Sequence, residues 1–299
     1  MANLNIYFGS HGIVAAPTIR RIEFSDICEA LANGAKDFYA VPSHLAFLAL
    51  IYPFCGVVLA YATSKQNALQ LLFPLSSGFA LIGPFAAVGL FEMSRRRELG
   101  LDISWKYAFH VVRSRSILSI AALGLLLLTI FAAWIAAAQL LYTMLFGPTP
   151  PTSLVDFLGD VVSTERGWML ISVGCFIGFV FAAVTLAISV VSFPLLLDRD
   201  IDAAMAVASS IEAVRENPVT MALWGLIVAA ALLIGSLPFF IGLAIVMPIL
   251  GHSTWHLYRK VIIRDPAQEH PIEWDNEGMG KSDHDRCSPN SLLFPWRED

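Results

Sequence analysis

The chain has 299 residues, of which 57% are hydrophobic and only 14% are charged, and its mean hydropathy is +0.66. A soluble domain usually has about 25% charged residues, so this composition excludes an ordinary soluble protein. The 19 basic and 24 acidic residues give a net charge of −5, but most acids lie outside the apolar stretches, so this value says little. No basic surface suggests a nucleic-acid partner. The four cysteines lie far apart and form no disulfide or metal motif: Cys28, Cys55, Cys175 and Cys287.

Long stretches without a charged residue define the membrane segments. Residues 116–155, 167–197 and 217–258 contain no Asp, Glu, Lys or Arg, and residues 44–91 contain only Lys65. A helix needs about 20 apolar residues to cross a hydrocarbon core about 30 Å thick. Division of these stretches at their turn residues predicts six spans, at residues 44–62, 71–93, 117–146, 168–197, 219–234 and 237–258.

The segments outside the spans are polar. Residues 1–21 have no apolar core behind a basic start, so no signal peptide is expected, and they are predicted to be a mobile extension. Residues 263–299 are rich in Pro, Asp, Glu and His without periodicity, which predicts a disordered cytoplasmic tail. The spans thus belong to one membrane domain, residues 22–262.

The distribution of Lys and Arg predicts the orientation, because cytoplasmic loops carry an excess of these residues. Fourteen of them precede the first span, lie in the second and fourth connections or directly follow the last span. Only Lys65 and Arg166 fall on the other side. Both termini are therefore expected in the cytoplasm.

A pattern of one amphipathic helix followed by a proline occurs twice. Residues 26–41 and 202–217 each begin with Asp and are each followed by Pro, sixteen residues after that Asp. In the first segment the predicted apolar face is Ile27, Ala30, Leu31, Ala35 and Phe38, and the predicted solvated face is Asp26, Glu29, Asn33, Lys36 and Asp37. In the second segment the predicted inward residues are Ala204, Met205, Ala208 and Ile211, and the outward ones are Ser209, Glu212 and Arg215.

Residues 102–116 form a looser third copy. The predicted fold is therefore an all-α membrane bundle of six spans, built as three units of an interfacial helix and a helical hairpin. A connector between spans is often amphipathic without any repeat, and that alternative stays open. The second span of each hairpin contains a proline, Pro84, Pro194 or Pro248, and each is predicted to kink its helix.

Charged residues near the cytoplasmic ends of spans form one candidate site. Glu92 lies at helical spacing from Arg95 and Arg96, and these charges predict either an interfacial ion pair or a substrate site. The acids Asp198, Asp200 and Asp202 leave the fourth span, where a solvated helix start and a divalent cation site are the two interpretations.

Histidines form the second candidate site. His252 and His256 are four residues apart on one helix face, and His44 begins the first span on the same side. This spacing suits a metal or haem site, although no H-E-x-x-H motif is present, and an ordinary interfacial belt with Trp255 and Tyr258 is the alternative. No catalytic motif is present, no ionisable residue lies deep within a predicted span, and no cofactor is predicted.

Several stretches resemble a known family: PSHLAFLALIYP at residues 42–53, LFPLSSGFALIGPFAAVGLFEMSRRRELGLD at 72–102, SFPLLLDRD at 192–200 and MPILGHSTWHLYRK at 247–260. They resemble bacterial, mainly alphaproteobacterial, integral membrane proteins that share a domain of unknown function. The resemblance covers about residues 22–261. It implies a six-span protein of the inner membrane and brings no activity or catalytic residue with it.

The sequence is compatible with three functions. The expected function is non-enzymatic: a scaffold, an assembly factor or a lipid-interacting component, with membrane lipids and other membrane proteins as partners. The alternative is a transporter or channel for an uncharged or amphipathic solute. The third is a metal- or haem-binding accessory of a respiratory chain.

Overall fold

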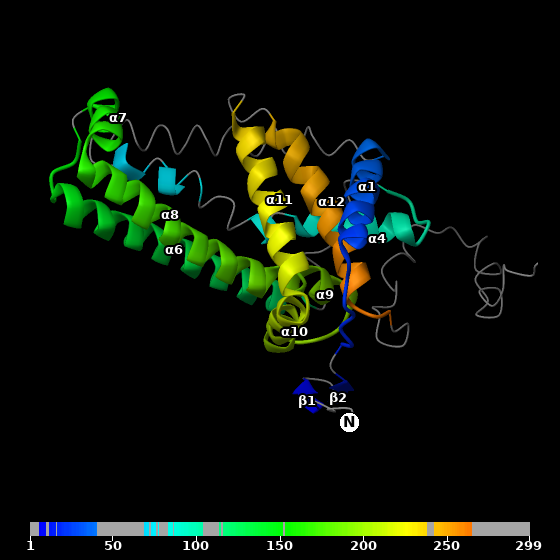
Figure 1. Cartoon of the computed structure of the whole chain (residues 1–299). Coiled ribbons are helices and arrows are strands. Elements are labelled where there is room, and N and C mark those ends of the chain that lie inside the picture. Colours follow the sequence, from blue (N-terminus) through cyan, green and yellow to red (C-terminus); the bar gives the residue numbers. More distant parts are fainter. Residues whose placement is uncertain are drawn as a thin grey trace, which may run out of the picture.

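A computed structural model of the chain describes residues 6–9, 12–15, 17–40, 69–71, 73–75, 77, 83–85, 87–103, 114, 116–151, 153–237 and 242–264. Helices dominate these residues, and the protein is an all-α membrane bundle with a short β-hairpin near its N-terminus. Figure 1 shows a long pair of helices, α6 and α8, extending away from an upright group formed by α11, α12 and α1. A single-turn 3₁₀ helix, η1 (Leu69–Leu71), contacts α6.

The long pair consists of α6 (Ile117–Phe146) and α8 (Glu165–Ser189), joined at its far end by α7 (Leu154–Ser163). Thr164 starts α8, since its hydroxyl accepts a hydrogen bond of 3.0 Å from Gly167 N. Many apolar side chains of the pair point outward, among them Phe176 and Phe179. Exposure of this kind is expected of helices that lie in lipid.

The fourth predicted span is broken near its end, where α8 gives way to α9 (Ser192–Asp198) at Val190 and Val191. Pro194 explains the break, because a proline cannot donate to the carbonyl four residues earlier and its ring clashes with that carbonyl. Neighbouring hydroxyls complete the hydrogen bonds. Val191 N donates to Ser210 Oγ over 3.2 Å, and the Ser192 hydroxyl contacts Ile188 O and also lies 3.0 Å from Ala206 O. A kink was predicted at Pro194, and the break between α8 and α9 lies three residues before it.

Ser210 and Ala206 both lie on α10 (Ala203–Glu216). Their contacts correct the predicted orientation of this helix. Ser209, Ser210 and Ala213 are buried, whereas the predicted inward residues Ala204, Ala208 and Ile211 are exposed. The prediction for this face was wrong because α10 turns its serines toward the broken turn, where unpaired backbone groups need partners. Met205 is buried, and Glu212 and Arg215 are exposed, both as predicted.

Asn217 ends α10, and α11 (Pro218–Ser236) begins at the next residue. Asn217 has a non-helical backbone (φ −128°, ψ 48°), as the steric restriction on a residue before proline requires. Its side chain accepts Ile22 N–H over 2.8 Å and donates to Arg20 O over 3.2 Å. The predicted bend between the second amphipathic helix and its span is confirmed here.

The last helix, α12 (Leu243–Val261), returns beside α11 and continues through Pro248. The sixth span was predicted from residue 237, but α12 begins at Leu243. Within the described residues three helical stretches are long and apolar enough to cross a membrane: Ile117–Phe146, Glu165–Asp198 and Pro218–Ser236. The predicted first span, 44–62, lies outside the described residues, and the second is described only in part, with Pro84 in a helical fragment at 83–85. The count of six spans therefore stays a prediction.

The first amphipathic helix, α1 (Phe24–Ala40), packs along α12. Its buried residues are Asp26, Ile27, Ala30, Gly34 and Asp37. The contact is close at Gly34, where an added Cβ would lie 2.6 Å from Ser253 N and 2.8 Å from Ser253 Cα. Pro42 and residues 104–113 lie outside the described residues, and the three-unit repeat stays a prediction.

The buried face of α1 corrects another prediction, because Asp26 and Asp37 were assigned to the solvated side. Both are buried, while Glu29 and Lys36 are exposed as predicted. The stripe Ile27–Ala30–Gly34–Asp37 follows helical spacing and ends on a carboxylate. Asp37 is tolerated there because groups on two other helices pair with it.

The two ends of the membrane domain meet. Arg20 N donates to Val261 O over 2.7 Å, Ile263 N donates to Thr18 O over 3.0 Å, and Ile19 pairs with Ile262. Further toward the N-terminus, β1 (Ile6–Gly9) and β2 (Gly12–Ala15) form an antiparallel hairpin. The predicted mobility of residues 1–21 stays a prediction, and residues 265–299 lie outside the described residues.

Candidate functional site

Charged and polar side chains gather where α1, α4 (Val88–Glu98), α9 and α12 meet. The centre of this cluster is the end of α4, where the sequence Ser-Arg-Arg-Arg-Glu places polar groups on every side of one helical turn. We call the cluster the polar junction. Its residues are Asp37, Glu92, Ser94, Arg95, Arg96, Arg97, Glu98, Asp198, His252, Trp255, His256, Tyr258 and Arg259.

One half of the polar junction surrounds Asp37, which is 4% exposed. Oδ2 of Asp37 accepts the Ser94 hydroxyl over 2.6 Å and lies 2.9 Å from His256 Nε2. Oδ1 of Asp37 accepts Arg97 Nη1 over 2.5 Å. Three donors from α4 and α12 therefore hold one carboxylate of α1, and this links three helices through a single side chain.

Ser94 connects the hydrogen bonds of Asp37 to His252, which is fully buried. Ser94 Oγ lies 2.7 Å from His252 Nδ1. Because the single hydroxyl proton of Ser94 is donated to Asp37, Ser94 can only accept from His252, which makes Nδ1 the protonated nitrogen. His252 Nε2 has no hydrogen-bond partner within the described residues. A neutral ring protonated at Nδ1 is the form that fits, since a second buried N–H would be unpaired.

The group of Ser94, His252 and Asp37 has a different order from that of a catalytic triad. In a triad the histidine lies between the serine and the carboxylate and takes the serine proton. Here the serine lies between the carboxylate and the histidine, and its side chain is 1% exposed. This geometry orders the helices and does not activate the hydroxyl as a nucleophile.

Two opposing influences act on the Asp37 carboxyl group. Burial alone would raise its pKa, but the hydrogen bonds from His256 and Ser94 outweigh burial and hold the pKa below its ordinary value. The same two influences act on Asp26 of this helix. Burial raises its pKa, but the hydrogen bond from Glu23 N–H and the contact with Arg20 have the larger effect, so the pKa of Asp26 lies below its ordinary value. Both acids are therefore carboxylates at neutral pH.

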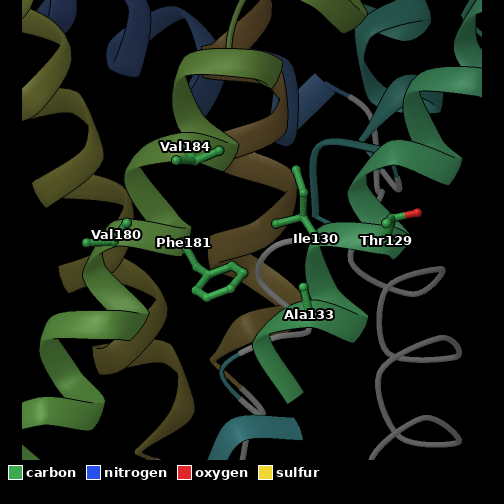
Figure 2. A pocket seen from close by; sticks show the side chains of 6 residues that line it. All are labelled: Thr129, Ile130, Ala133, Val180, Phe181 and Val184. Atoms are coloured by element: carbon green, nitrogen blue, oxygen red, sulfur yellow. The ribbon is translucent and has the colours of Figure 1, made fainter. Parts of the chain in front are cut away.

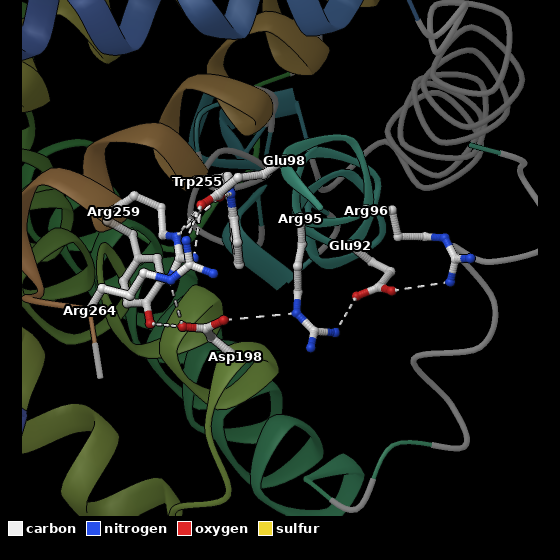
Figure 3. A network of polar contacts seen from close by, with 9 residues as sticks. Glu92, Arg95, Arg96, Glu98, Asp198, Trp255, Arg259 and Arg264 are labelled. Atoms are coloured by element: carbon white, nitrogen blue, oxygen red, sulfur yellow. Dashed lines mark hydrogen bonds and ion pairs between the residues drawn. The ribbon is translucent and has the colours of Figure 1, made fainter. Parts of the chain in front are cut away.

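The other half of the polar junction surrounds Asp198, at the end of α9 (Figure 3). Asp198 accepts the Tyr258 hydroxyl over 2.6 Å and Arg259 Nη1 over 3.1 Å, and Arg95 Nε lies 3.8 Å away. Arg95 also donates to Glu92 over 3.4 Å. A chain of alternating charges thus connects α4, α9 and α12.

Further contacts at the edge of this half join α4 to α12. Arg259 Nη2 donates to Glu98 Oε1 over 2.8 Å, and Trp255 Nε1 donates to Glu98 Oε2 over 3.1 Å (Figure 3). The Arg259 guanidinium also lies 5.5 Å from the centroid of the Trp255 ring, within the range of a cation–π contact. Arg264 lies 3.9 Å from Glu98, near the end of the described chain.

The first predicted site is only partly assembled in space. Glu92, Arg95, Arg96 and Asp198 come together, with Arg96 Nη1 3.8 Å from Glu92. Asp200 and Asp202 do not join them. Asp200 is exposed, and Asp202 begins α10 by accepting Met205 N over 2.7 Å. Of the two interpretations offered for these acids, the helix start applies to Asp202.

The predicted metal or haem site is not tested by the structure, because His44 lies outside the described residues. His252 and His256 do come together, through one carboxylate: His256 contacts Asp37 directly, and His252 reaches it through Ser94. Within the described residues no group of three or more His, Cys, Asp or Glu side chains could hold a metal ion. The metal site stays a prediction.

Sequence analysis overlooked several members of the polar junction: Asp37, Ser94, Arg97, Glu98, Tyr258 and Arg259. A signal for Asp37 was present, because it continues the spacing of Ile27, Ala30 and Gly34 along one face. Its partners lie 57 and 219 residues away in the sequence, at Ser94 and His256, so no local pattern predicts the pairing.

A second feature is an apolar groove of about 300 Å³ between α6 and α8 (Figure 2). Thr129, Ile130 and Ala133 line it from the middle of α6, and Val180, Phe181 and Val184 line it from α8. The Thr129 hydroxyl donates to Leu125 O over 2.9 Å, so its proton is already used within α6. The groove suits an apolar chain better than a polar solute.

Comparison with known proteins agrees with the membrane character of these helices. Residues 72–198 match the DUF2189 family, described as predicted integral membrane proteins. The DUF2189 segment includes Glu92, the polar end of α4 and Asp198, whereas Asp37 and all of α12 lie outside it. No curated protein and no solved structure matches the chain.

Proposed function

We propose that this chain is a multi-pass protein of the bacterial inner membrane with a non-catalytic role, as a scaffold, an assembly factor or a lipid-interacting component. The observation that carries the proposal is the pairing within the polar junction. Asp37 and Asp198 are each paired with groups from two other helices. Charges used in this way fix the positions of helices, and removing one partner of a buried pair costs about 3–5 kcal/mol.

The positions of the basic residues support the proposed orientation, with both termini in the cytoplasm. Thr18 and Ile263 are hydrogen-bonded neighbours, so both ends of the membrane domain lie on one side. Arg21 contacts Glu216, and Arg95 contacts Asp198, which brings the predicted cytoplasmic connections to this side as well. Arg166 lies in the first turn of α8, at the opposite end of the α6–α8 pair. This asymmetry is the one expected when the polar junction faces the cytoplasm.

The apolar groove favours the lipid-interacting form of this function over transport. Its lining residues lie near the midpoints of α6 and of the Glu165–Asp198 stretch, at a depth that acyl chains reach in a bilayer. A transport path for an uncharged solute would need polar groups in its lining, and the Thr129 hydroxyl is already bonded to Leu125 O.

Purified protein reconstituted in liposomes tests this proposal against transport. We expect the permeability to small uncharged solutes, measured by light scattering after an osmotic step, to equal that of protein-free liposomes. We also expect native mass spectrometry to find retained phospholipid, and the thermal midpoint in detergent to rise when phospholipid is added. Solute permeability above the protein-free value would show the transporter or channel function instead. A thermal midpoint that does not respond to lipid would contradict the lipid-interacting role.

A further inference from the structure

The short helix α7 closes the far end of the α6–α8 pair, and sequence analysis did not predict it. In Figure 1 it runs across the end of the pair instead of along it. Ser153 begins the helix by accepting Asp156 N over 3.4 Å. Phe157 anchors it, with ring centroids 5.9 Å from Tyr142 and 6.2 Å from Phe146 of α6. The orientation of α7 is therefore fixed by an aromatic contact on one of its faces.

The residues that point away from this contact divide into two sides. Val155, Leu158 and Val162 are 77%, 52% and 61% exposed, and their spacing of three and four residues places them on one stripe. Asp156, Asp160 and Ser163 share the opposite side and are also exposed. Exposed valine and leucine side chains in a stripe, opposite acids, are the pattern of a helix lying at a boundary between apolar and aqueous phases.

The position of α7 matches the level of the lipid headgroups. With 30 residues, α6 is about 45 Å long at 1.5 Å per residue, which exceeds a hydrocarbon core of about 30 Å. The far end of α6 therefore reaches the headgroup region when its apolar middle lies in the core. Trp168 and Met169, exposed at the start of α8, and Met144, exposed near the end of α6, continue the apolar surface toward α7. Tryptophan is enriched at this level of membrane proteins.

We infer that α7 is an interfacial helix that inserts Val155, Leu158 and Val162 among the lipids of the leaflet opposite the polar junction. Asp156 and Asp160 then face water. The partner of this apolar stripe is the lipid itself, at the boundary between its acyl chains and its headgroups. Because the exposed charges of α7 are acidic, burial of apolar surface drives the insertion, and attraction to anionic lipids does not. The choice of leaflet rests on the membrane orientation given under the proposed function.

Nitroxide labels on single cysteines test the inference in the full chain. The background carries alanine at Cys28, Cys55, Cys175 and Cys287, and liposomes are made of zwitterionic phosphatidylcholine. Labels are placed in turn on the apolar stripe, at Val155, Leu158 and Val162, and on the acidic side, at Asp156, Asp160 and Ser163. A label at Phe179, in the exposed middle of α8, serves as the reference for lipid contact. The measured quantity is the ratio of collision rates with oxygen, which partitions into lipid, and with a water-soluble nickel chelate.

We expect a severalfold higher ratio at the three stripe positions than at the three acidic-side positions, and no change when anionic lipid is added. Equal ratios on the two sides, with a lipid-like ratio at Phe179, would overturn the inference while leaving the membrane arrangement intact. Labels on the stripe that neither reagent reaches would show a protein partner there and would also overturn it. A water-like ratio at Phe179 would instead contradict the proposed membrane arrangement.

Discussion

The Ser94 hydroxyl of α4 donates to the Asp37 carboxylate of α1 over 2.6 Å, in a place where both side chains are buried. The same oxygen of Asp37 also lies within hydrogen-bonding distance of His256 on α12. One acid at the end of an amphipathic helix therefore determines how three helices meet. Its burial is stable only while all of these donors are present.

Replacing Asp37 tests this relationship. We expect Asp37→Asn to lower the free energy of unfolding by about 3 kcal/mol, because it leaves the buried donors around position 37 poorly paired. Unfolding in mixed detergent micelles measures the change. The matched control is Glu29→Gln on the same helix, whose carboxylate is exposed and pairs with Lys260 over 2.7 Å; its cost should stay below about 1 kcal/mol. Equal stability of the two variants would contradict the role given to Asp37.

The lowered pKa of Asp37 predicts a dependence of stability on acid. An aspartate in an unfolded chain has a pKa of about 3.9, so the unfolded state takes up protons before the folded state does as the pH falls. The stabilisation by Asp37 is therefore complete above about pH 5 and is lost as the pH falls through the folded-state pKa. We expect the thermal midpoint of Asp37→Asn to fall less steeply below about pH 5 than that of the native protein. Parallel curves for the two proteins would show that Asp37 is not responsible.

The close contact of α1 with α12 depends on Gly34. An alanine there would place its Cβ 2.6 Å from Ser253 N, and a clash with backbone cannot be relieved by turning a side chain. We expect Gly34→Ala to cost about 1–3 kcal/mol of stability and to weaken the pairing at Asp37. The control is Gly174→Ala in α8, where the nearest atom, Leu141 Cδ2, is 3.6 Å away. A Gly34→Ala variant as stable as Gly174→Ala would show that the two helices are not packed so closely.

Local sequence patterns predicted the parts of this fold that depend on local physics. The bounds of α6 at Ile117 and Phe146 match the predicted span, because apolar residues end there at Gly147 and Pro148. The boundary between α10 and α11 was predicted from Pro218, since a proline restricts the residue before it. In both places the neighbouring residues alone determine where the helix ends.

Features that depend on distant partners were predicted poorly. Asp37 was placed on the solvated side because its neighbours in the sequence give no sign of Ser94 or His256. The buried side of α10 was missed for a similar reason: Ser210 points inward to meet Val191 N, which the break before Pro194 leaves without a helical partner. Hydropathy ranks both residues as surface residues. Helix α7 was missed because its ten residues lie between the third and fourth predicted spans, where no element was predicted.

The topology of the membrane domain is tested most directly by reporter fusions in living bacteria, with an enzyme active only in the periplasm and a fluorescent protein active only in the cytoplasm. We expect periplasmic signals for fusions at Gln66 and Thr152, and cytoplasmic signals for fusions at Ile103 and Ala208. Ile103 follows the polar end of α4, and Ala208 lies in α10. A periplasmic signal at Ile103 would place the polar junction on the periplasmic side of the membrane and would overturn the proposed topology.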